Sequence, residues 1–307
     1  MALLGSMVLA GCSSEPEAGT AIGSTATSSQ ISTLQIRVGD WVFDARVAGP
    51  ANGELVLLLH GFPETSLEWQ SQLNELAKAG YRVVAPDQRG YSPGARPPDV
   101  ASYTINAIAL DTLGIVDALG YDRFHLVGHD WGALVAWTVA AVVPRSVQTL
   151  TVLSWPHPRA FATALADTQS CQYQASAYFD VFTKNGVTLA ELAQTGTGMG
   201  GVPPGALLEY VAKVLANPPA LAAALNWYRA NVAGRRVGST MTFGPIHVPT
   251  LYMWGSEDQA FCRDTAEASA RYVTAPYRFI ALEGAGHWLP ESNAAQVNQE
   301  LLMHLSR

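Results

Sequence analysis

The chain has 307 residues and a formal net charge of −7; 14% of its residues are charged and 49% are hydrophobic. This length suits one large α/β domain with an insertion, and no segment repeats at a fixed period, which excludes a repeat protein. The absence of a basic cluster argues against nucleic-acid binding.

The first 32 residues differ in composition from the rest. An apolar run over residues 2–10 leads to Leu9-Ala-Gly-Cys12, and residues 13–32 are rich in small and polar residues, as in a flexible tether. The motif resembles a bacterial lipobox, in which Cys12 would be lipidated. The run is too short to span a bilayer, and no Lys or Arg precedes it. We expect an exported, membrane-anchored lipoprotein; the alternative is a cytoplasmic protein with a frayed N-terminus.

Strands and helices are predicted to alternate after this segment. Two strands meet at Gly39-Asp40, a hairpin signal, and the apolar run over 55–59 is typical of a strand covered on both faces. Thr104 is a plausible N-cap for a helix that starts at Ile105. The first part of the chain is predicted to contain strands over 34–38, 41–47, 55–59, 81–85, 124–127 and 149–153, and helices over 66–79, 105–119 and 133–143.

The alternation stops between residues 159 and 240, which have the pattern of helices and loops around a Gly/Pro-rich break. It resumes with strands over 250–253 and 278–281 and helices over 263–272 and 293–305. Alternating strands and helices predict a mostly parallel sheet with right-handed crossovers. The interruption predicts a helical insertion.

The stretch Gly128-His-Asp-Trp-Gly132 joins a buried strand to a helix. Its glycines allow the sharp turn called a nucleophile elbow, which exposes the central side chain. Here that side chain is Asp130, rather than Ser or Cys. The alternative reading is an ordinary N-cap of the following helix, but the elbow exposes this position.

Two further candidate residues follow later strands, and the order Asp130, Asp258, His287 is the α/β-hydrolase order of nucleophile, acid and histidine. In a parallel sheet the carboxyl ends of the strands meet at one edge. We therefore expect these residues to converge there, together with His60. Glu257 competes with Asp258 for the acid role.

Five motifs in chain order resemble the epoxide hydrolase family over residues 33–307. They are His60-Gly-Phe-Pro63, Asp87-x-Arg-Gly90, Gly128-His-Asp-Trp-Gly132, Trp155-Pro-His-Pro158 and Gly286-His287. The resemblance implies an α/β-hydrolase fold, with a mostly parallel central sheet flanked by helices and a helical cap insertion. The implied segments are an N-terminal signal and tether over 1–32, a core over 33–157 and 240–307, and a cap over 158–239.

An aspartate nucleophile suits attack on an sp3 carbon, because it forms an ester that water can cleave. His287 would act as general base and Asp258 would orient its ring. By analogy with the fold, the backbone N–H groups of Phe62 and Trp131 would form the oxyanion hole.

The resemblance also implies a pair of cap tyrosines that protonate the alkoxide. Asn226-Trp-Tyr-Arg229 nominates Tyr228, and Ser176-Ala-Tyr178 nominates Tyr178, with Tyr173 as its rival. A phenol, with a pKa of about 10, stays protonated at neutral pH yet can donate to an alkoxide. The alternative is that these tyrosines only pack the cap.

We predict an apolar pocket between core and cap, lined in part by His60, Pro63 and Trp155, that takes a small epoxide and water without a cofactor or metal. His60 and His129 are expected to be mainly structural. Cys171 and Cys262 could pair in an oxidising compartment, but the sequence favours two unpaired thiols. It does not indicate an oligomeric state.

Two other functions remain open. Haloalkane and haloacid dehalogenases share the aspartate nucleophile, and Trp131 fits a halide donor, although Phe62 departs from the Asn often found in haloalkane dehalogenases. Fluoroacetate dehalogenases carry Arg where Trp131 stands. The two tyrosines favour epoxide opening. A non-catalytic lipoprotein that binds an apolar ligand is the alternative of another class.

Overall fold

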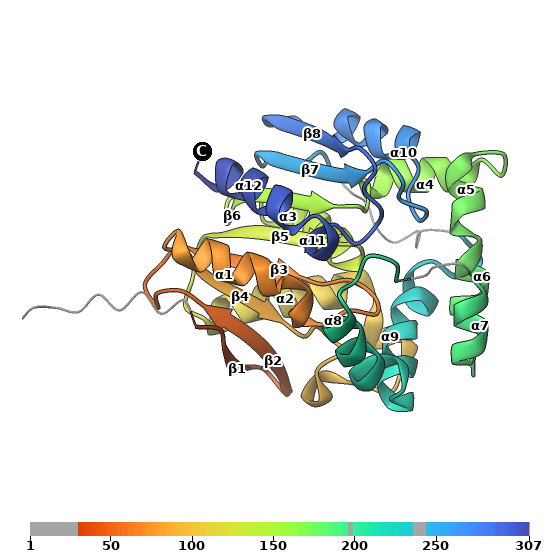
Figure 1. Ribbon diagram of the computed structural model, residues 1–307, viewed down its shortest axis with the longest axis horizontal. Coiled ribbons are helices and arrows are strands. Elements are labelled where there is room, and N and C mark those ends of the chain that lie inside the picture. Colours follow the sequence, from red (N-terminus) through yellow and green to blue (C-terminus); the bar gives the residue numbers. More distant parts are fainter. Residues whose placement is uncertain (1–29, 196–198, 236–243, 307) are drawn as a thin grey trace, which may run out of the picture.

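The computed structural model describes residues 30–195, 199–235 and 244–306 (Figure 1). The described strands form one eight-stranded sheet in the order β1-β2-β4-β3-β5-β6-β7-β8. Strand β2 is antiparallel to both β1 and β4, and the other neighbours are parallel. The predicted fold class, a mostly parallel sheet flanked by helices, is confirmed.

The predicted lipobox with Cys12 lies outside the described residues. Within the described residues, no helix has the length and apolar character needed to cross a bilayer.

The elements agree closely with those predicted. The strands are β1 (Ser32–Val38), β2 (Trp41–Ala48), β3 (Leu55–Leu59), β4 (Arg82–Pro86), β5 (Phe124–His129), β6 (Val147–Leu153), β7 (Thr250–Gly255) and β8 (Tyr277–Leu282). The core α-helices are α1 (Gln70–Lys78), α2 (Ile105–Ala118), α3 (Trp131–Val142), α10 (Arg263–Ala268), α11 (Leu289–Ser292) and α12 (Ala294–Leu305). Short 3-10 helices in the core are η1 (Ser66–Trp69), η2 (Pro93–Ala95), η3 (Val100–Tyr103) and η7 (Ser269–Tyr272).

The side chains of β3 show why its run is apolar throughout. Leu55, Leu57 and Leu59 enter the core cluster that contains α2 and α3, whereas Val56 and Leu58 enter the cluster with α1, α11 and α12. Successive side chains of a strand point to opposite faces. Both faces of this strand therefore need an apolar residue at every position, as a parallel sheet covered by helices requires.

Between β6 and β7 lies a helical segment over residues 158–235, hereafter the cap. Its helices gather at the end of the sheet to which the parallel strands point (Figure 1). They are α4 (Pro158–Ala166), α5 (Cys171–Ala175), η4 (Ser176–Tyr178), α6 (Phe179–Phe182), α7 (Leu189–Gln194), α8 (Pro204–Tyr210), η5 (Val211–Leu215, a π-helix), α9 (Pro218–Asn231) and η6 (Ala233–Arg235). The sequence predicts a helical insertion in this stretch.

The N-terminus of α2 differs from the prediction in its capping. Thr104 occupies the N-cap position, but its side chain makes no capping hydrogen bond. Instead, the N–H of Ile105 donates to Asn231 Oδ1 at 2.8 Å, and Asn231 Nδ2 donates to the carbonyl of Tyr103. The side chain that caps the N-terminus of α2 therefore comes from α9, a helix of the inserted segment. The same contact attaches this inserted segment to the core.

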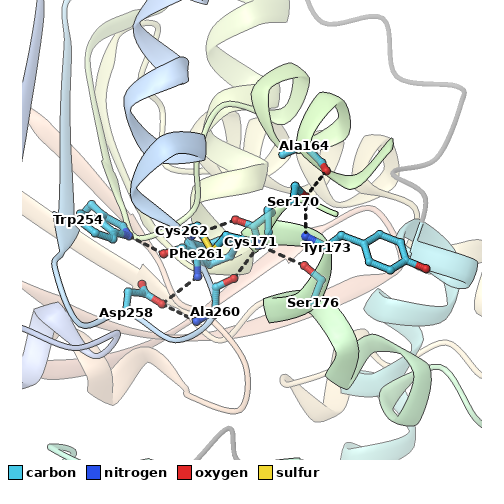
Figure 2. Close-up of a disulfide and its surroundings, with 11 residues drawn as sticks. Ala164, Ser170, Cys171, Tyr173, Ser176, Trp254, Asp258, Ala260, Phe261 and Cys262 are labelled. Carbon is cyan, nitrogen blue, oxygen red and sulfur yellow. Dashed lines mark hydrogen bonds between the residues drawn. A yellow bond between two sulfur atoms is a disulfide. The ribbon is translucent and has the colours of Figure 1, made fainter. Parts of the chain in front are cut away.

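The expectation of two unpaired thiols was wrong. Cys171, at the start of α5, forms a disulfide with Cys262, which precedes α10, and their Cα atoms lie 6.2 Å apart (Figure 2). The two residues are 91 positions apart in the chain. They meet because the cap segment α4–α5 folds back onto α10, a tertiary contact that the spacing of cysteines does not reveal.

Candidate active site

Asp130 lies at a sharp turn between β5 and α3. Its φ is +48°, a conformation that only close packing of the turn sustains. A Cβ on Gly128 would come within 2.2 Å of the Gly132 carbonyl oxygen, and one on Gly132 within 2.0 Å of the Leu59 carbonyl oxygen. The Asp130 side chain makes no capping bond to α3. The sequence thus forms an elbow here, and the side chain is left for chemistry rather than for helix capping.

One oxygen of the Asp130 carboxylate already has a backbone donor. The N–H of Phe62 donates to Asp130 Oδ1 at 3.0 Å, from the loop after β3, where the Phe62–Pro63 peptide is cis. Trp131, the other predicted oxyanion donor, is the first residue of α3. The structure thus places the Phe62 donor on the carboxylate, and the role of the Trp131 N–H stays a prediction.

His287 lies between the two predicted aspartates. Its Nδ1–H donates to Asp258 Oδ2 at 3.0 Å, and its Nε2 lies 3.7 Å from Asp130 Oδ2. The second Asp258 oxygen accepts the N–H groups of Ala260 and Phe261 at 2.8 and 3.1 Å. Three donors hold Asp258 rigidly, so its carboxylate fixes the orientation of the imidazole ring.

The electrostatics of His287 suit a base. Burial alone would lower the pKa of its imidazole, but the charge and hydrogen bond of Asp258 outweigh burial and raise the pKa above its ordinary value. Glu257, the rival for the acid position, is exposed. The structure therefore brings Asp130, His287 and Asp258 together and leaves Glu257 outside.

Both predicted cap tyrosines are buried beside the elbow. Tyr178 and Tyr228 have ring centroids 6.2 Å apart, and burial together with the charge of Asp130 raises the pKa of each well above its ordinary value. Tyr173 lies elsewhere, with the Arg235 guanidinium 4.7 Å from its ring, and it points away from Asp258 (Figure 2). The geometry therefore favours Tyr178 over Tyr173 as the partner of Tyr228.

Aromatic rings enclose this site. The Tyr228 ring lies edge-on to Trp131 at 4.9 Å and to Phe62 at 5.4 Å, and Phe182 lies 4.9 Å from it. Trp155 packs against Trp131 at 4.8 Å and is fully buried. These rings form an aromatic cluster next to the elbow, an environment that suits an apolar substrate.

His60 holds the loop after β3. Its Nδ1–H donates to the Gly61 carbonyl at 2.8 Å, its Nε2 accepts the N–H of Gln88 at 3.0 Å, and burial lowers its pKa. Both ring nitrogens are therefore engaged, and the described contacts support the predicted structural role of His60 rather than its predicted place in the pocket lining.

A buried cluster of His129, Glu64 and Glu68 lies behind the elbow and was not predicted from the sequence. His129 Nδ1 lies 3.1 Å from Glu64 Oε2 and 3.2 Å from Glu68 Oε1, all three side chains are fully buried, and Glu68 also accepts the N–H of Gly61. Burial and the neighbouring charge of Glu68 raise the pKa of Glu64 to about 8. Burial would lower the pKa of His129, but the two carboxyl groups raise it well above its ordinary value. Glu64 directly follows the His60-Gly-Phe-Pro63 motif, and this position next to a site motif is the sequence feature that could have predicted the cluster.

Among the residues that the structure describes, this cluster is also the one group with three possible metal ligands, whose donor atoms lie within 4.8 Å of one another. The Nδ1–H of His129 donates to Glu64 Oε2, and the same nitrogen lies 3.2 Å from Glu68 Oε1. These contacts make the three side chains one buried polar cluster.

Comparisons with known proteins show the family of the chain. Residues 54–294 match the family profile of the alpha/beta hydrolase fold. The chain is 33% identical to AB hydrolase superfamily protein YfhM of Bacillus subtilis and 32% identical to Epoxide hydrolase A of Mycobacterium tuberculosis, and each alignment covers 84% of this chain and 92% of the relative. A solved structure described as "Novel epoxide hydrolases belonging to the alpha/beta hydrolases superfamily in metagenomes from hot environments" matches with a TM-score of 0.81 and 26% identity, over 90% of this chain and 99% of that one. The chain therefore belongs to the epoxide hydrolase family of the α/β-hydrolase fold.

Proposed function

We propose that this protein is an epoxide hydrolase that converts an apolar epoxide and water to a vicinal diol. The observation that carries the proposal is the placement of two buried phenols, Tyr178 and Tyr228, beside the elbow carboxylate of Asp130. A carboxylate nucleophile opposite two proton donors suits the opening of a three-membered ether, because the leaving oxygen stays on the substrate and needs a proton.

In the first step Asp130 Oδ2 attacks one epoxide carbon, and the bond between that carbon and the ring oxygen breaks. The electron pair of this bond stays on the oxygen, which takes a proton from Tyr178 or Tyr228. Burial raises the pKa of both phenols, so they are protonated at neutral pH and available as acids. The product is an ester between Asp130 and the hydroxyalkyl group.

In the second step water attacks the ester carbon, and His287 Nε2 takes its proton. The 3.7 Å distance between Nε2 and Asp130 Oδ2 is longer than a hydrogen bond, so Nε2 is free to accept a proton from water. Negative charge develops on Oδ1, where the Phe62 N–H already donates. Collapse of this intermediate breaks the ester bond, and His287 returns its proton to the leaving diol oxygen. Asp130 is left as a carboxylic acid; its proton goes to the tyrosinate formed in the first step, which restores both the Asp130 carboxylate and the phenol.

The test is intact-protein mass spectrometry of the full chain carrying His287→Ala. Without its base the enzyme should form the ester but not hydrolyse it, so incubation with a pool of epoxides should add the mass of one whole epoxide. Asp130→Asn in the same background should remove the adduct. A pool of halogenated compounds separates the alternatives.

Two outcomes contradict epoxide hydrolysis. An adduct from the halogenated pool that has lost hydrogen halide, without one from epoxides, would indicate a dehalogenase. No adduct from either pool, in a protein whose circular dichroism matches the parent, would favour a non-catalytic binder of apolar ligands.

We further propose that the protein acts in an oxidising compartment as an exported lipoprotein anchored at Cys12. The Cys171–Cys262 disulfide supports export, because structural disulfides persist outside the reducing cytosol. Membrane fractionation of a bacterial expression host compares the parent with Cys12→Ala. Release of the variant into the soluble fraction is expected, and an equal distribution of the two proteins would refute the anchor.

A further inference from the structure

The disulfide joins the two segments that carry a cap tyrosine and the triad acid. On the cap side, Cys171 opens α5, which leads within seven residues to Tyr178. On the core side, Cys262 ends the loop that begins at Asp258. Figure 2 shows this loop and the start of α5 on either side of the sulfur bridge.

A buried glutamine next to the disulfide reinforces the same junction. Gln172 Nε2 donates to the Ala260 carbonyl at 2.8 Å, and Gln172 Oε1 accepts the N–H of Cys262 at 3.1 Å. The Gln172 side chain is fully buried. We call the loop over residues 258–262 the acid loop, because it begins at Asp258. One covalent bond and two hydrogen bonds therefore connect α5 to residues 260–262 of the acid loop.

The anchored loop residues are the same ones that hold the acid. The N–H groups of Ala260 and Phe261 donate to Asp258 Oδ1, and the Phe261 carbonyl accepts the indole N–H of Trp254 at 2.8 Å. These bonds lie within the core and do not depend on Gln172. The acid loop is thus held in place by the core, and the cap segment is attached to this loop.

On the cap side the attachment leads toward the tyrosine. Gln172 Nε2 also donates to Ser176 Oγ at 3.1 Å, and Ser176 begins the single turn that ends at Tyr178. The Tyr178 ring then packs against Phe182 at 5.1 Å and faces Tyr228. The position of Tyr178 relative to the core is therefore set through α5 and its junction with the acid loop.

We propose that Gln172 and the Cys171–Cys262 disulfide act as a positioning clamp that holds Tyr178 over Asp130, so that the rate of epoxide opening depends on the oxidation state of the disulfide. The proposal rests on the function proposed above. Cys171 is exposed, so a dithiol can reach the bridge. Reduction transfers two electrons and two protons from dithiothreitol, which becomes a cyclic disulfide, and leaves two cysteine thiols.

The experiment measures the two chemical steps separately. Rapid-quench mass spectrometry with one epoxide gives the rate of ester formation, and decay of the ester after substrate dilution gives the rate of its hydrolysis. The forms compared are the oxidised protein, the dithiothreitol-reduced protein, Cys171→Ser/Cys262→Ser and Gln172→Met. Gln174→Met is the matched control, because Gln174 lies on the same short helix and is exposed, and its side chain donates only to the Thr168 carbonyl among the described hydrogen bonds.

The expected result is that ester formation slows about tenfold in the reduced protein, the double variant and Gln172→Met, because small displacements of a catalytic group have large effects on rate. Ester hydrolysis should change less than about threefold, because the core bonds of Asp258 remain. Reoxidation should restore the parent protein but not the double variant, and Gln174→Met should behave as the parent.

Unchanged ester formation after reduction, with the mass increase of two hydrogens verified, would overturn the proposal. An equal slowing of both steps would do the same, because it would indicate general loosening of the fold. If the double variant does not fold, Gln172→Met, which keeps the disulfide, decides the outcome. A parent protein that forms no epoxide ester at all would instead refute the proposed function.

Discussion

The Nε2–H of His129 donates to the backbone carbonyl of His287 at 3.0 Å, so the residue before the nucleophile supports the loop that carries the base. The two rings lie 4.9 Å apart. The other ring nitrogen of His129 contacts Glu64 and Glu68, and Glu68 in turn accepts the N–H of Gly61 next to the oxyanion donor. A single buried cluster therefore connects the three loops of the active site.

This cluster should make the protein less stable as the pH rises. The pKa of Glu64 is raised to about 8 in the folded protein, above its ordinary value of 4.5, and that of His129 is raised above 6.5. For both groups the folded state holds the proton more tightly than the unfolded state. Their contribution is therefore present at low pH and is lost as the pH rises through the folded-state pKa.

We expect the free energy of unfolding to fall by about 2 kcal/mol between pH 5 and pH 9, as measured by urea denaturation. Glu64→Gln should flatten this dependence, whereas Glu75→Gln, at an exposed position on α1, should leave it as in the parent. A Glu64→Gln profile as steep as the parent profile would show that Glu64 does not titrate in this range.

Ester hydrolysis should increase with pH until His287 is neutral. The pKa of His287 is raised above its ordinary value by Asp258, so the rate should rise through a pH above 6.5 and then level off. Asp258→Asn should shift this rise to lower pH and slow hydrolysis about 10²–10⁴-fold. Single-turnover decay of the ester across pH measures both effects. Glu257→Gln is the control, and a shift in that variant would transfer the acid role to Glu257.

Loss of a cap tyrosine should slow ester formation without a comparable effect on hydrolysis. We expect about 10–100-fold from Tyr178→Phe or Tyr228→Phe and a larger effect from the double variant, because one phenol can still protonate the alkoxide in each single variant. Rapid-quench measurement of the ester gives these rates. Tyr173→Phe should match the parent, since Tyr173 lies under Arg235. A Tyr173→Phe defect as large as that of Tyr178→Phe would reverse the assignment.

The sheet and the elbow could be predicted because their signals are local. The run from Leu55 to Leu59 is apolar at every position, and the glycines around Asp130 stand where a side chain would strike the neighbouring backbone. The order of the strands also places Asp258 and His287 at the same edge of the sheet as Asp130.

The features that could not be predicted from the sequence depend on tertiary contacts between distant segments. Ile105 is capped by Asn231 from the cap, and not by the adjacent Thr104. Cys171 meets Cys262 only because the cap folds onto α10. The spacing of residues in the sequence predicts neither contact. The sequence instead favours the adjacent Thr104 as the capping residue and two unpaired cysteines.

The disulfide should also contribute strongly to stability. It closes a loop between residues 91 positions apart, and in the chain-entropy account such a cross-link restricts the unfolded chain. We expect Cys171→Ser/Cys262→Ser to lower the free energy of unfolding by about 2–5 kcal/mol, measured by urea denaturation under oxidising conditions. Dithiothreitol should lower the stability of the parent to that of the variant and leave the variant unchanged. If the reduced parent stayed as stable as the oxidised parent, the cap segment would be held by its noncovalent contacts alone, among them the two hydrogen bonds of Gln172 to the acid loop, and the covalent bond would add nothing to the fold.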